Sequence, residues 1–461
     1  MDDLLPRDIG DLAQGLRARR FTAEAVVEAC LARIARIDPA LNSFVALDAD
    51  GARIAARESD ARFAAGQPRS ILEGIPLSIK DNILVRGLPA TWGSRAFADF
   101  VPEVDELPVA RLRAAGAIIL GKTNVPELTL EGYTNNDLFG VTRNPWNQAL
   151  TPGGSSGGAA ASVAAGLVPA AIGTDGGGSI RRPACHTGLV GFKPSTGRIA
   201  RIDGFPAILT DFETVGTLTR SVADLLLLDT LAGPDARDRR SLYAPALPFE
   251  GARRRILYIP RVAACPVDPE VAAATEGVAR FLADAGHVVQ RAEMFFDLDE
   301  LGRVWHVVTR SGVAWMMRRE SRLAALAGAS VRQMAADGEK IGGADYIGAL
   351  EWVAGFRRRC AEVFSDADLI LTPTVAALPW RAEQPYPVEI AGQPAGPRDH
   401  AVFTGWVNIA GLPAISLPVA ISRDGLPIGV QVVAGFGADI GLLEFAAGFE
   451  QRWEAPPLPD L

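Results

Sequence analysis

Cysteine is scarce in this sequence, and no two cysteines stand close together. Cys30, Cys185, Cys265 and Cys360 lie far apart along the chain and form no C-x-x-C motif. Structural zinc sites and disulfide-rich scaffolds need more cysteines or closer ones. The pattern argues against both classes and predicts buried thiols in a reducing compartment.

Positive charge is also in short supply. The chain has 46 lysine and arginine residues against 54 aspartate and glutamate residues, which gives a net charge of −8 at pH 7. Proteins that bind nucleic acids draw much of their affinity from basic side chains that neutralise phosphates. We therefore expect no nucleic-acid partner.

Long hydrophobic runs and a secretion signal are missing as well. The most apolar stretch, residues 158–173, consists mainly of alanine and glycine and contains Pro169. It is shorter than the ~18 apolar residues that indicate a membrane span. The chain starts Met1-Asp2-Asp3, which is acidic where a signal peptide is basic, and no apolar segment follows. These features predict a cytoplasmic protein that does not enter a membrane.

What the sequence does contain is an alternation of helical and strand patterns, which is typical of an α/β sheet. A helical period covers residues 22–37 and should end at Asp38-Pro39, because proline disfavours helix. Further helices are predicted at 109–115, 159–165 and 440–452, and short apolar strands at 75–79, 117–120, 168–172, 369–371, 414–419 and 428–433. From about 225 to 400, long helical patterns dominate. No repeat or low-complexity linker divides the chain, so we expect one domain over residues 1–461.

A nucleotide-binding motif occurs, but its surroundings do not fit. Residues 116–123 match the P-loop expression G-x-x-x-x-G-K-[ST]. In a P-loop the four variable positions form a turn around phosphates, whereas here they are Ala-Ile-Ile-Leu, which predicts a strand. Pro126 follows where a helix should begin. We therefore do not expect nucleotide binding.

A second motif, residues 153–157, fits the G-x-S-x-G nucleophile elbow of α/β-hydrolases. That reading makes Ser155 the nucleophile and needs a later histidine as base. Only His400 occupies a plausible position, and the elbow is preceded by a proline-bounded loop in place of a strand. An esterase that uses Ser155 is the distant alternative.

A third pattern joins three separate places. Lys80 ends an apolar strand, Ser155 lies in Gly-Gly-Ser-Ser-Gly-Gly, and Ser179 follows Asp-Gly-Gly-Gly. The stretch of residues 153–194, with Gly-Thr-Asp-Gly-Gly-Gly-Ser-Ile-Arg and Gly-Phe-Lys-Pro, resembles the defining motif of the amidase signature family. Similarity extends to Gly-Lys-Thr-Asn at 121–124, to 139–146 and to 410–418.

The resemblance implies a fold and an organisation. We expect an α/β amidase-signature fold with a large mixed central β-sheet covered by helices on both faces. The signature core would span about residues 70–220, and a helical insertion at about 225–400 would determine the substrate.

It also implies a catalytic triad. Ser179 would be the nucleophile, Ser155 a relay that follows a cis peptide bond after Gly154, and Lys80 the terminal base. A lysine can act as a base only if it is neutral, and burial favours the neutral form. Burial is plausible for Lys80 because it ends an apolar strand.

The glycines before the nucleophile suit an oxyanion hole. Gly176, Gly177 and Gly178 carry no side chains, so their N–H groups and that of Ser179 can converge on one oxygen. The reaction implied is acyl transfer from a carboxylic amide, an anilide or a carbamate (urethane) to Ser179 and then to water. Neither a metal nor an organic cofactor is required.

Substrate choice is less constrained. By position in the family motif, Thr129 and Leu130 line the pocket, and Arg182 either pairs with an acidic substrate or forms an internal salt bridge. An apolar wall that would suit aryl amides could come from Trp305, Trp315, Trp380, Phe403 and Trp406. We expect a monomer or homodimer acting on a small-molecule amide or carbamate. The main alternative is the glutaminase (A-type) subunit of a tRNA-dependent amidotransferase, which would need partner subunits.

Overall fold

The computed structural model describes residues 5, 8–227, 231–243, 245, 247–249 and 251–459. Residues 1–3, on which the prediction about a signal peptide rests, lie outside the described residues. The helices are α1 (Ile9–Arg17), α2 (Ala23–Leu41), α3 (Ala49–Ala64), α4 (Leu107–Ala115), α5 (Gly157–Ala164), α6 (Arg181–Thr187), α7 (Val222–Leu227), α8 (Pro269–Asp284), α9 (Leu298–Arg319), α10 (Ser321–Leu326), α11 (Ala329–Gly338), α12 (Gly343–Asp366), α13 (Gly405–Ala410) and α14 (Asp439–Glu450). The strands are β1 (Phe44–Leu47), β2 (Pro76–Lys80), β3 (Ile118–Thr123), β4 (Ala170–Asp175), β5 (Val190–Lys193), β6 (Thr214–Thr219), β7 (Arg255–Tyr258), β8 (Val288–Arg291), β9 (Leu369–Pro373), β10 (Glu389–Ile390), β11 (Gln393–Pro394), β12 (Ala414–Ile421) and β13 (Pro427–Ala434).

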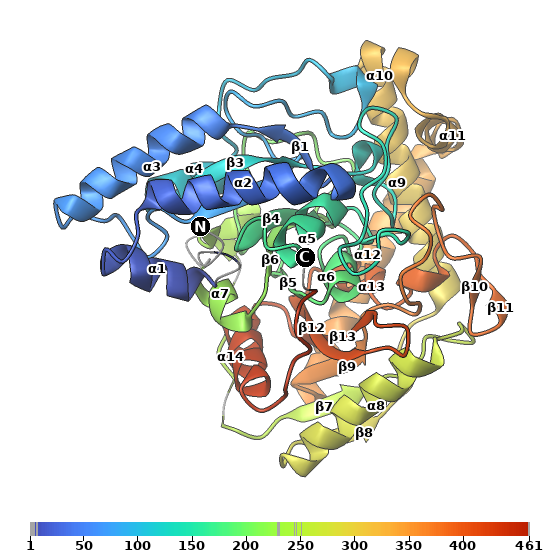
Figure 1. Ribbon diagram of the computed structural model, residues 1–461. Coiled ribbons are helices and arrows are strands. Elements are labelled where there is room, and N and C mark those ends of the chain that lie inside the picture. The colour runs from blue at the N-terminus through green and yellow to red at the C-terminus, as the bar shows by residue number, and fades with distance from the viewer. Residues whose placement is uncertain are drawn as a thin grey trace.

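One large sheet runs through the molecule. Its 11 strands lie in the order β1-β3-β2-β4-β6-β5-β12-β13-β9-β7-β8. Strands β3, β2 and β4 run parallel, as do β9, β7 and β8, whereas the pairs between β4 and β9 are antiparallel. Figure 1 shows α2 and α3 at one side of the molecule and the long helices α9 and α12 at the other. The prediction of an α/β fold with a large mixed sheet is confirmed.

Helices cover both faces of this sheet, as strand β13 illustrates. Successive side chains of a strand point to opposite faces. Val430 and Val432 pack in one apolar cluster with Leu442 of α14. Val433 packs in a different cluster with Trp406 of α13. The two clusters therefore lie on opposite faces, and both faces are buried.

The parallel strands β2 and β4 bring polar residues to one edge of the sheet. Ile79 lies opposite Ile172, and every residue of both strands is buried. A strand buried on both faces has a continuous apolar sequence, which is what the sequence shows at these positions. Lys80 ends β2, and Thr174 and Asp175 end β4. The carboxyl ends of both strands thus place these three side chains near each other.

The segment at 225–400 is not entirely helical, and that prediction is wrong for β7 and β8. These strands extend the central sheet beyond β9 by parallel pairing. Each has four residues, and a four-residue apolar run does not distinguish strand from helix by its period. Strand β7 pairs with β9, which lies about a hundred residues away in sequence, and β8 pairs with β7, so the strand conformation depends on distant partners.

Helix α2 continues past Pro39 to Leu41, so the predicted end at Asp38-Pro39 is wrong. The predicted start is right, because the Thr22 side chain accepts a hydrogen bond from the N–H of Ala25. Proline in a last turn removes only one helical hydrogen bond. The Asp38 carboxylate compensates by accepting the backbone N–H groups of Ser43 and Phe44, which hold the following turn.

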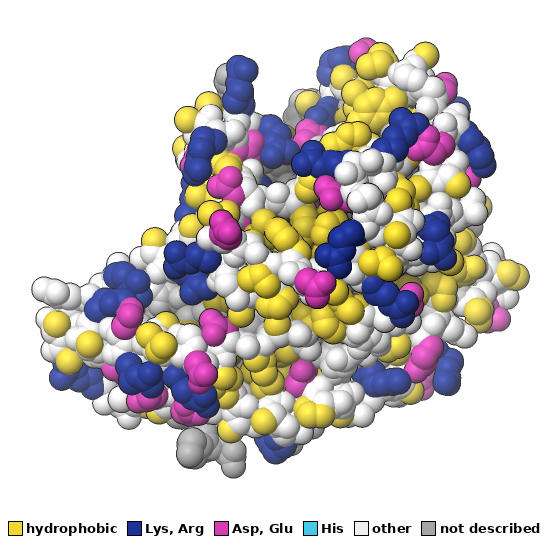
Figure 2. All heavy atoms as spheres, turned by 90° about the horizontal axis from the view of Figure 1, so that it is seen from above, with side chains coloured by type: hydrophobic (Ala, Val, Ile, Leu, Met, Phe, Trp, Pro, Cys, Tyr) yellow, Lys and Arg dark blue, Asp and Glu magenta, His cyan; other side chains and the backbone are white. Residues whose placement is uncertain are grey.

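The outer surface carries charges of both signs. Figure 2 shows basic and acidic side chains interspersed over one face, with hydrophobic side chains gathered near its middle. That face therefore lacks the continuous basic surface on which phosphates bind. Across the described parts of the chain, no helix combines the length and the apolar character that crossing a membrane requires.

The tight packing of the sheet predicts a strong difference between two glycines. A Cβ on Gly216 of β6 would lie 2.2 Å from the Phe192 carbonyl oxygen, whereas a Cβ on Gly277 of α8 would meet nothing within 4 Å. We expect Gly216→Ala to lower the free energy of unfolding by ~1–3 kcal/mol, since overpacking forces the backbone apart. Gly277→Ala should raise it by up to ~1 kcal/mol, because alanine favours helix. Urea denaturation measures both, and equal effects would contradict this account of the packing.

Candidate active site

Three chain segments meet at the carboxyl edge of β2 and β4. Lys80 comes from the end of β2, Ser155 precedes α5, and Ser179 lies between β4 and α6. The N–H of Ser156 donates to the carbonyl oxygen of Ser179 at 3.1 Å, which joins the two serine segments. The Lys80 Nζ donates to Ser155 Oγ at 2.9 Å. The structure thus gathers the predicted lysine and both predicted serines at one place.

Lys80 is completely buried and has three hydrogen-bond partners. Its Nζ lies 2.9 Å from Ser155 Oγ, 2.9 Å from Thr174 Oγ1 and 3.0 Å from the Thr174 carbonyl oxygen. Burial lowers the pKa of Lys80 to about 7, although the negative charges of Glu213 and Asp175 oppose this shift. Near neutral pH the amine is therefore substantially populated. Its lone pair can accept the hydroxyl proton of Ser155, while Thr174, which sequence reasoning did not identify, accepts the amine protons.

The backbone around Ser155 is unusually close to its neighbours. The peptide bond between Gly154 and Ser155 is cis, as the family resemblance implies. A Cβ on Gly154 would lie 2.5 Å from the Tyr133 carbonyl oxygen, so only glycine fits there without displacement. This explains why a glycine precedes the serine that contacts Lys80.

Three of the four N–H groups predicted to form an oxyanion hole have no acceptor among the described residues. Within the described residues, no acceptor is bound to the N–H groups of Gly176, Gly177 or Ser179. The N–H of Gly178, however, donates to Asp175 Oδ1 at 2.7 Å. The prediction that Gly178 supplies a free donor is wrong, because the buried carboxylate of Asp175 already uses it. Three free donors remain beside the Ser179 hydroxyl.

The buried carboxylate of Asp175 organises this segment. It accepts the N–H groups of Gly178 and Ile180, and it forms an ion pair with Arg181 at 2.8 Å. Burial alone would raise the pKa of Asp175, but the Arg181 guanidinium holds that pKa well below its usual range. Asn408 donates to the same carboxylate at 3.0 Å. Sequence reasoning matched Arg181 to a family pattern but missed the roles of Asp175 and Asn408. The signal for Asp175 was its position directly before the glycines.

A small cavity of about 20 Å³ opens beside Ser179. It is lined by Thr129, Leu130, Gly176, Gly177, Ser179, Arg182, Leu209, Glu213, Trp305, Thr309 and Arg398. The three residues predicted to bind substrate, Thr129, Leu130 and Arg182, are all among them. Sequence reasoning missed Glu213 and Arg398, which come from segments without a recognisable motif.

The predicted apolar wall is wrong for four of its five aromatic residues. Only Trp305 lines the cavity beside Ser179. Trp315 is 46% exposed on the outer side of α9, and Phe403 and Trp406 lie fully inside apolar clusters. Trp380 packs against His400, with ring centroids 4.7 Å apart. Aromatic composition alone did not distinguish core residues from pocket residues.

The predicted alternative for Arg182, an internal salt bridge, is not what the structure has. Arg182 donates from Nε to the Gly178 carbonyl oxygen at 3.3 Å, and its Nη1 lies 3.2 Å from His400 Nε2. No carboxylate lies within ion-pair distance of it among the described residues.

His400 therefore contacts Arg182, whereas Ser155 contacts Lys80. The esterase alternative, in which a histidine activates Ser155, is contradicted by these contacts.

The P-loop expression also fails in the structure, because residues Ile118–Thr123 form strand β3. Lys122 is buried and donates to the carbonyl oxygens of Asp81 and Pro89, which leaves no lysine to hold phosphate.

Within the described ranges, no group of three or more His, Cys, Asp and Glu side chains has the arrangement of a metal site.

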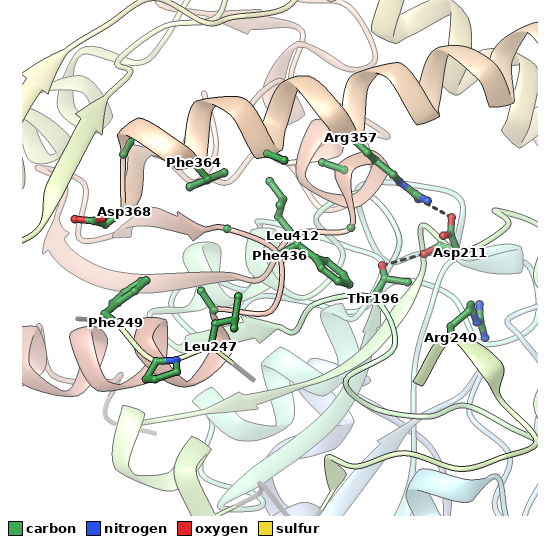
Figure 3. A pocket seen from close by; sticks show the side chains of 17 residues that line it. Thr196, Asp211, Arg240, Leu247, Phe249, Arg357, Phe364, Asp368, Leu412 and Phe436 are labelled. Carbon is green, nitrogen blue, oxygen red and sulfur yellow. Dashed lines mark hydrogen bonds and ion pairs between the residues drawn. The ribbon is translucent and has the colours of Figure 1, made fainter. Parts of the chain in front are cut away.

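A larger cavity lies elsewhere, and its charged side chains are paired. It has a volume of about 730 Å³ and is shown in Figure 3. Its Arg357 is bound to Asp211 at 2.8 Å, and its Asp368 is bound to Arg255 at 2.9 Å. Because its charged side chains are paired and the Thr196 hydroxyl that lines it donates to the Asp211 carbonyl oxygen, the small cavity beside Ser179 is the candidate active site.

Comparisons with known proteins agree with this geometry. The model of the Amidase family matches residues 25–443. The A-type subunit of glutamyl-tRNA(Gln) amidotransferase from Acidothermus cellulolyticus is 36% identical, covering 98% of this chain and 95% of that protein. A solved bacterial aryl acylamidase of the amidase signature enzymes has a TM-score of 0.89 at 28% identity, covering 96% of each chain. The solved A-type subunit of glutamyl-tRNA(Gln) amidotransferase from Thermotoga maritima has a TM-score of 0.77 at 28% identity, covering 95% of this chain and 94% of that one.

The ion pair at the end of β4 predicts a large effect of one substitution. Asp175→Asn leaves the Arg181 guanidinium buried without a counter-charge, and we expect it to lower the free energy of unfolding by ~3–5 kcal/mol. Asp235→Asn is the matched control, because Asp235 pairs with Arg237 at the surface and its loss should leave the denaturation midpoint nearly unchanged. A small effect of Asp175→Asn would mean that the pair does not hold this segment.

Proposed function

The chain belongs to the amidase family, and from this premise we propose that it hydrolyses the C–N bond of a carboxylic amide through an acyl-enzyme on Ser179. The observation that carries the proposal is the buried Lys80, whose Nζ is hydrogen-bonded to Ser155 and whose pKa is about 7. A neutral lysine in contact with a serine is a base ready to accept a proton. Hydrolysis of C–N bonds other than peptide bonds is the activity that family membership supports.

In the first half-reaction, Ser179 Oγ attacks the amide carbonyl carbon. Its proton passes to Ser155 Oγ, and the Ser155 proton passes to the neutral Lys80 Nζ. The carbonyl oxygen becomes an anion that the free N–H groups of Gly176, Gly177 and Ser179 can stabilise. The new ammonium keeps Ser155 Oγ and both oxygens of Thr174 as acceptors.

Acylation is completed when Lys80 returns the proton through Ser155 to the leaving nitrogen. The C–N bond breaks, and ammonia or an amine departs. In the second half-reaction, water attacks the Ser179 ester and gives its proton to Lys80 along the same path. Breakdown of this second intermediate releases the carboxylic acid, and the proton returns to Ser179 Oγ.

The apolar side chains of Leu209 and Trp305 line the cavity beside Ser179. Anilides and carbamates present the same electrophilic carbonyl, and the likeness to a bacterial aryl acylamidase supports an aryl leaving group. We propose that the enzyme acts in the cytoplasm as a monomer or homodimer.

A second candidate function is the glutaminase component of a tRNA-dependent amidotransferase. It is favoured by the 36% identity to the A-type subunit of the Acidothermus cellulolyticus enzyme. The higher TM-score with the aryl acylamidase, 0.89 against 0.77 for the Thermotoga maritima protein at the same identity, favours the amidase.

The purified chain alone, assayed on acetanilide and on glutamine, separates the two candidate functions. Release of aniline supports the amidase, whereas release of ammonia from glutamine alone supports the glutaminase component.

The nucleophile can be tested by covalent labelling. A fluorophosphonate should label the wild-type chain on Ser179, and Ser179→Ala should abolish both labelling and amide hydrolysis, with a loss of at least ~10³-fold in kcat. Ser365→Ala is the control, since Ser365 lies exposed near the end of α12 and bonds only the Glu362 carbonyl oxygen. Full labelling of Ser179→Ala would overturn the assignment.

The pKa of Lys80 sets the expected pH dependence. Because only the neutral amine accepts a proton, kcat/KM should rise about tenfold per pH unit below pH 7 and level off above ~8.5. Lys80→Met should remove this rise and nearly all activity. The measurement is kcat/KM for one anilide from about pH 5.5 to about pH 9.5. A profile that is flat, or that falls as pH rises, would rule out Lys80 as the base.

A further inference from the structure

Two arginines face the active-site cavity without an acidic partner. Arg182 and Arg398 both line it together with Ser179. Among the described residues, neither forms an ion pair with a carboxylate. Most other arginines near the site are paired: Arg181 is bound to Asp175, and Arg201 is bound to Glu106 and Glu213. The two lining the cavity therefore differ from their neighbours.

Arg182 is held in place by neutral groups. It is 3% exposed, and its acceptors are the Gly178 carbonyl oxygen and the ring nitrogen of His400. Burial and the positive charge of Arg182 keep the pKa of His400 well below its usual range, so the ring is neutral. Within hydrogen-bonding distance Arg182 meets only neutral groups among the described residues, and the negative charges of Asp175 and Glu131 act on it from beyond ion-pair distance. A buried charge in that state favours binding of an anion.

Glycines leave the room that this arginine needs. A Cβ on Gly132 would lie 3.2 Å from Arg182 Nη1, and a Cβ on Gly178 would lie 2.9 Å from Arg182 Nε. Arg182 is therefore enclosed by backbone on two sides. Its remaining nitrogen, Nη2, makes no hydrogen bond within the part of the chain that is described.

Arg398 lies next to the same glycine segment. Its guanidinium carbon is 5.0 Å from the centroid of the Trp305 ring, which orients the group by a cation–π contact. A Cβ on Gly177 would lie 3.6 Å from Arg398 Nη2. The side chain forms no hydrogen bond with any described residue. Arg398 is therefore next to the segment that carries the nucleophile, with all of its donors available.

No described acid forms an ion pair with these two cations, although the negative charge of Glu131 acts on the pKa of both in the raising direction. Glu213 lines the cavity, but its carboxylate is bound to Arg201. Glu131 accepts a hydrogen bond from Ser330 Oγ at 2.8 Å and forms no ion pair with any described residue. Burial, and after it the positive charge of Arg398, lower the pKa of Arg182 to about 9, which still leaves it charged at neutral pH. An anion between the two arginines would relieve their mutual repulsion.

We propose that the substrate is an amide that carries a carboxylate, and that Arg182 and Arg398 bind this carboxylate while Ser179 attacks the amide carbonyl. The inference rests on the proposed amidase function. Guanidinium groups bind carboxylates by paired, charge-assisted hydrogen bonds.

The test compares substrates of equal shape and different charge. One pair is the 4-nitroanilide of butanedioic acid, with a free carboxylate on the acyl side, and the neutral 4-nitroanilide of 4-methylpentanoic acid. The other pair is N-acetyl-4-aminobenzoate, with the carboxylate on the leaving amine, and N-acetyl-4-isopropylaniline. In one pair the anion should have a kcat/KM about 10- to 100-fold higher than its neutral partner, and which pair shows it assigns the side that the arginines bind.

The variants test whether the arginines cause this preference. Arg398→Gln should lower the ratio of kcat/KM for the anion to that for the neutral substrate by at least about tenfold, mainly through KM. Arg182→Lys should lower the ratio less than Arg182→Gln does, because lysine keeps the charge but loses the fork. The matched control is Arg303→Gln on α9, which removes an exposed charge (74% exposed) outside the cavity and should leave the ratio unchanged.

The outcomes separate this inference from the proposed function. If both neutral anilides are hydrolysed as fast as the anions, amidase activity stands and the carboxylate inference fails. The inference also fails if Arg398→Gln slows both members of a pair equally, because the arginines would then act only on the oxyanion. If no substrate is hydrolysed, the proposed function fails. Inhibition by butanedioate but not by butanoate, lost in Arg398→Gln, would support the inference independently of turnover.

Discussion

The buried ion pair between Asp175 and Arg181 is the interaction on which the site depends. Asp175 ends strand β4, and its carboxylate binds the Arg181 side chain and the N–H groups of Gly178 and Ile180. These contacts hold the segment with Ser179 in one conformation against α6. Because Gly178 is engaged in this way, its N–H is not free, whereas those of Gly176, Gly177 and Ser179 have no acceptor among the described residues. A contact that stabilises the loop thus also decides which N–H groups stay available for hydrogen bonding.

Burial acts differently on the two kinds of cation in this site. Lys80 is fully buried, and the loss of solvent lowers its pKa to about 7, so it can exchange a proton near neutral pH. Arg182 is nearly as buried, but an arginine starts from so high a pKa that it keeps its charge. Desolvation therefore brings the lysine close to neutrality near pH 7 but leaves the arginine charged. The same physical effect has different consequences because the two side chains start from different pKa values.

Much of the fold, and the three residues Lys80, Ser155 and Ser179 that it brings together, could be predicted from the sequence, because both leave local signals. Apolar runs buried on both faces identify strands such as β2 and β4, and glycine clusters mark the segments around Ser155 and Ser179. Short strands such as β7 and β8 leave no such signal, since four residues are too few to show a period and their conformation depends on a distant partner. The helix end at Pro39 was mispredicted for a different reason. The side chain of Asp38 stabilises the turn that follows, and a proline rule alone does not include this contact.

The sequence by itself determined the residues available for chemistry and their family pattern: Lys80 after an apolar strand, and two serines among glycines. Only the tertiary structure decided which of the predicted groups are free to act. It engaged Gly178, moved most of the aromatic residues into the core, and placed Arg398 beside Arg182 although they are more than two hundred residues apart. The reason is that composition records which charges and donors exist, whereas a pKa or a free hydrogen-bonding group depends on which neighbours the fold brings within contact.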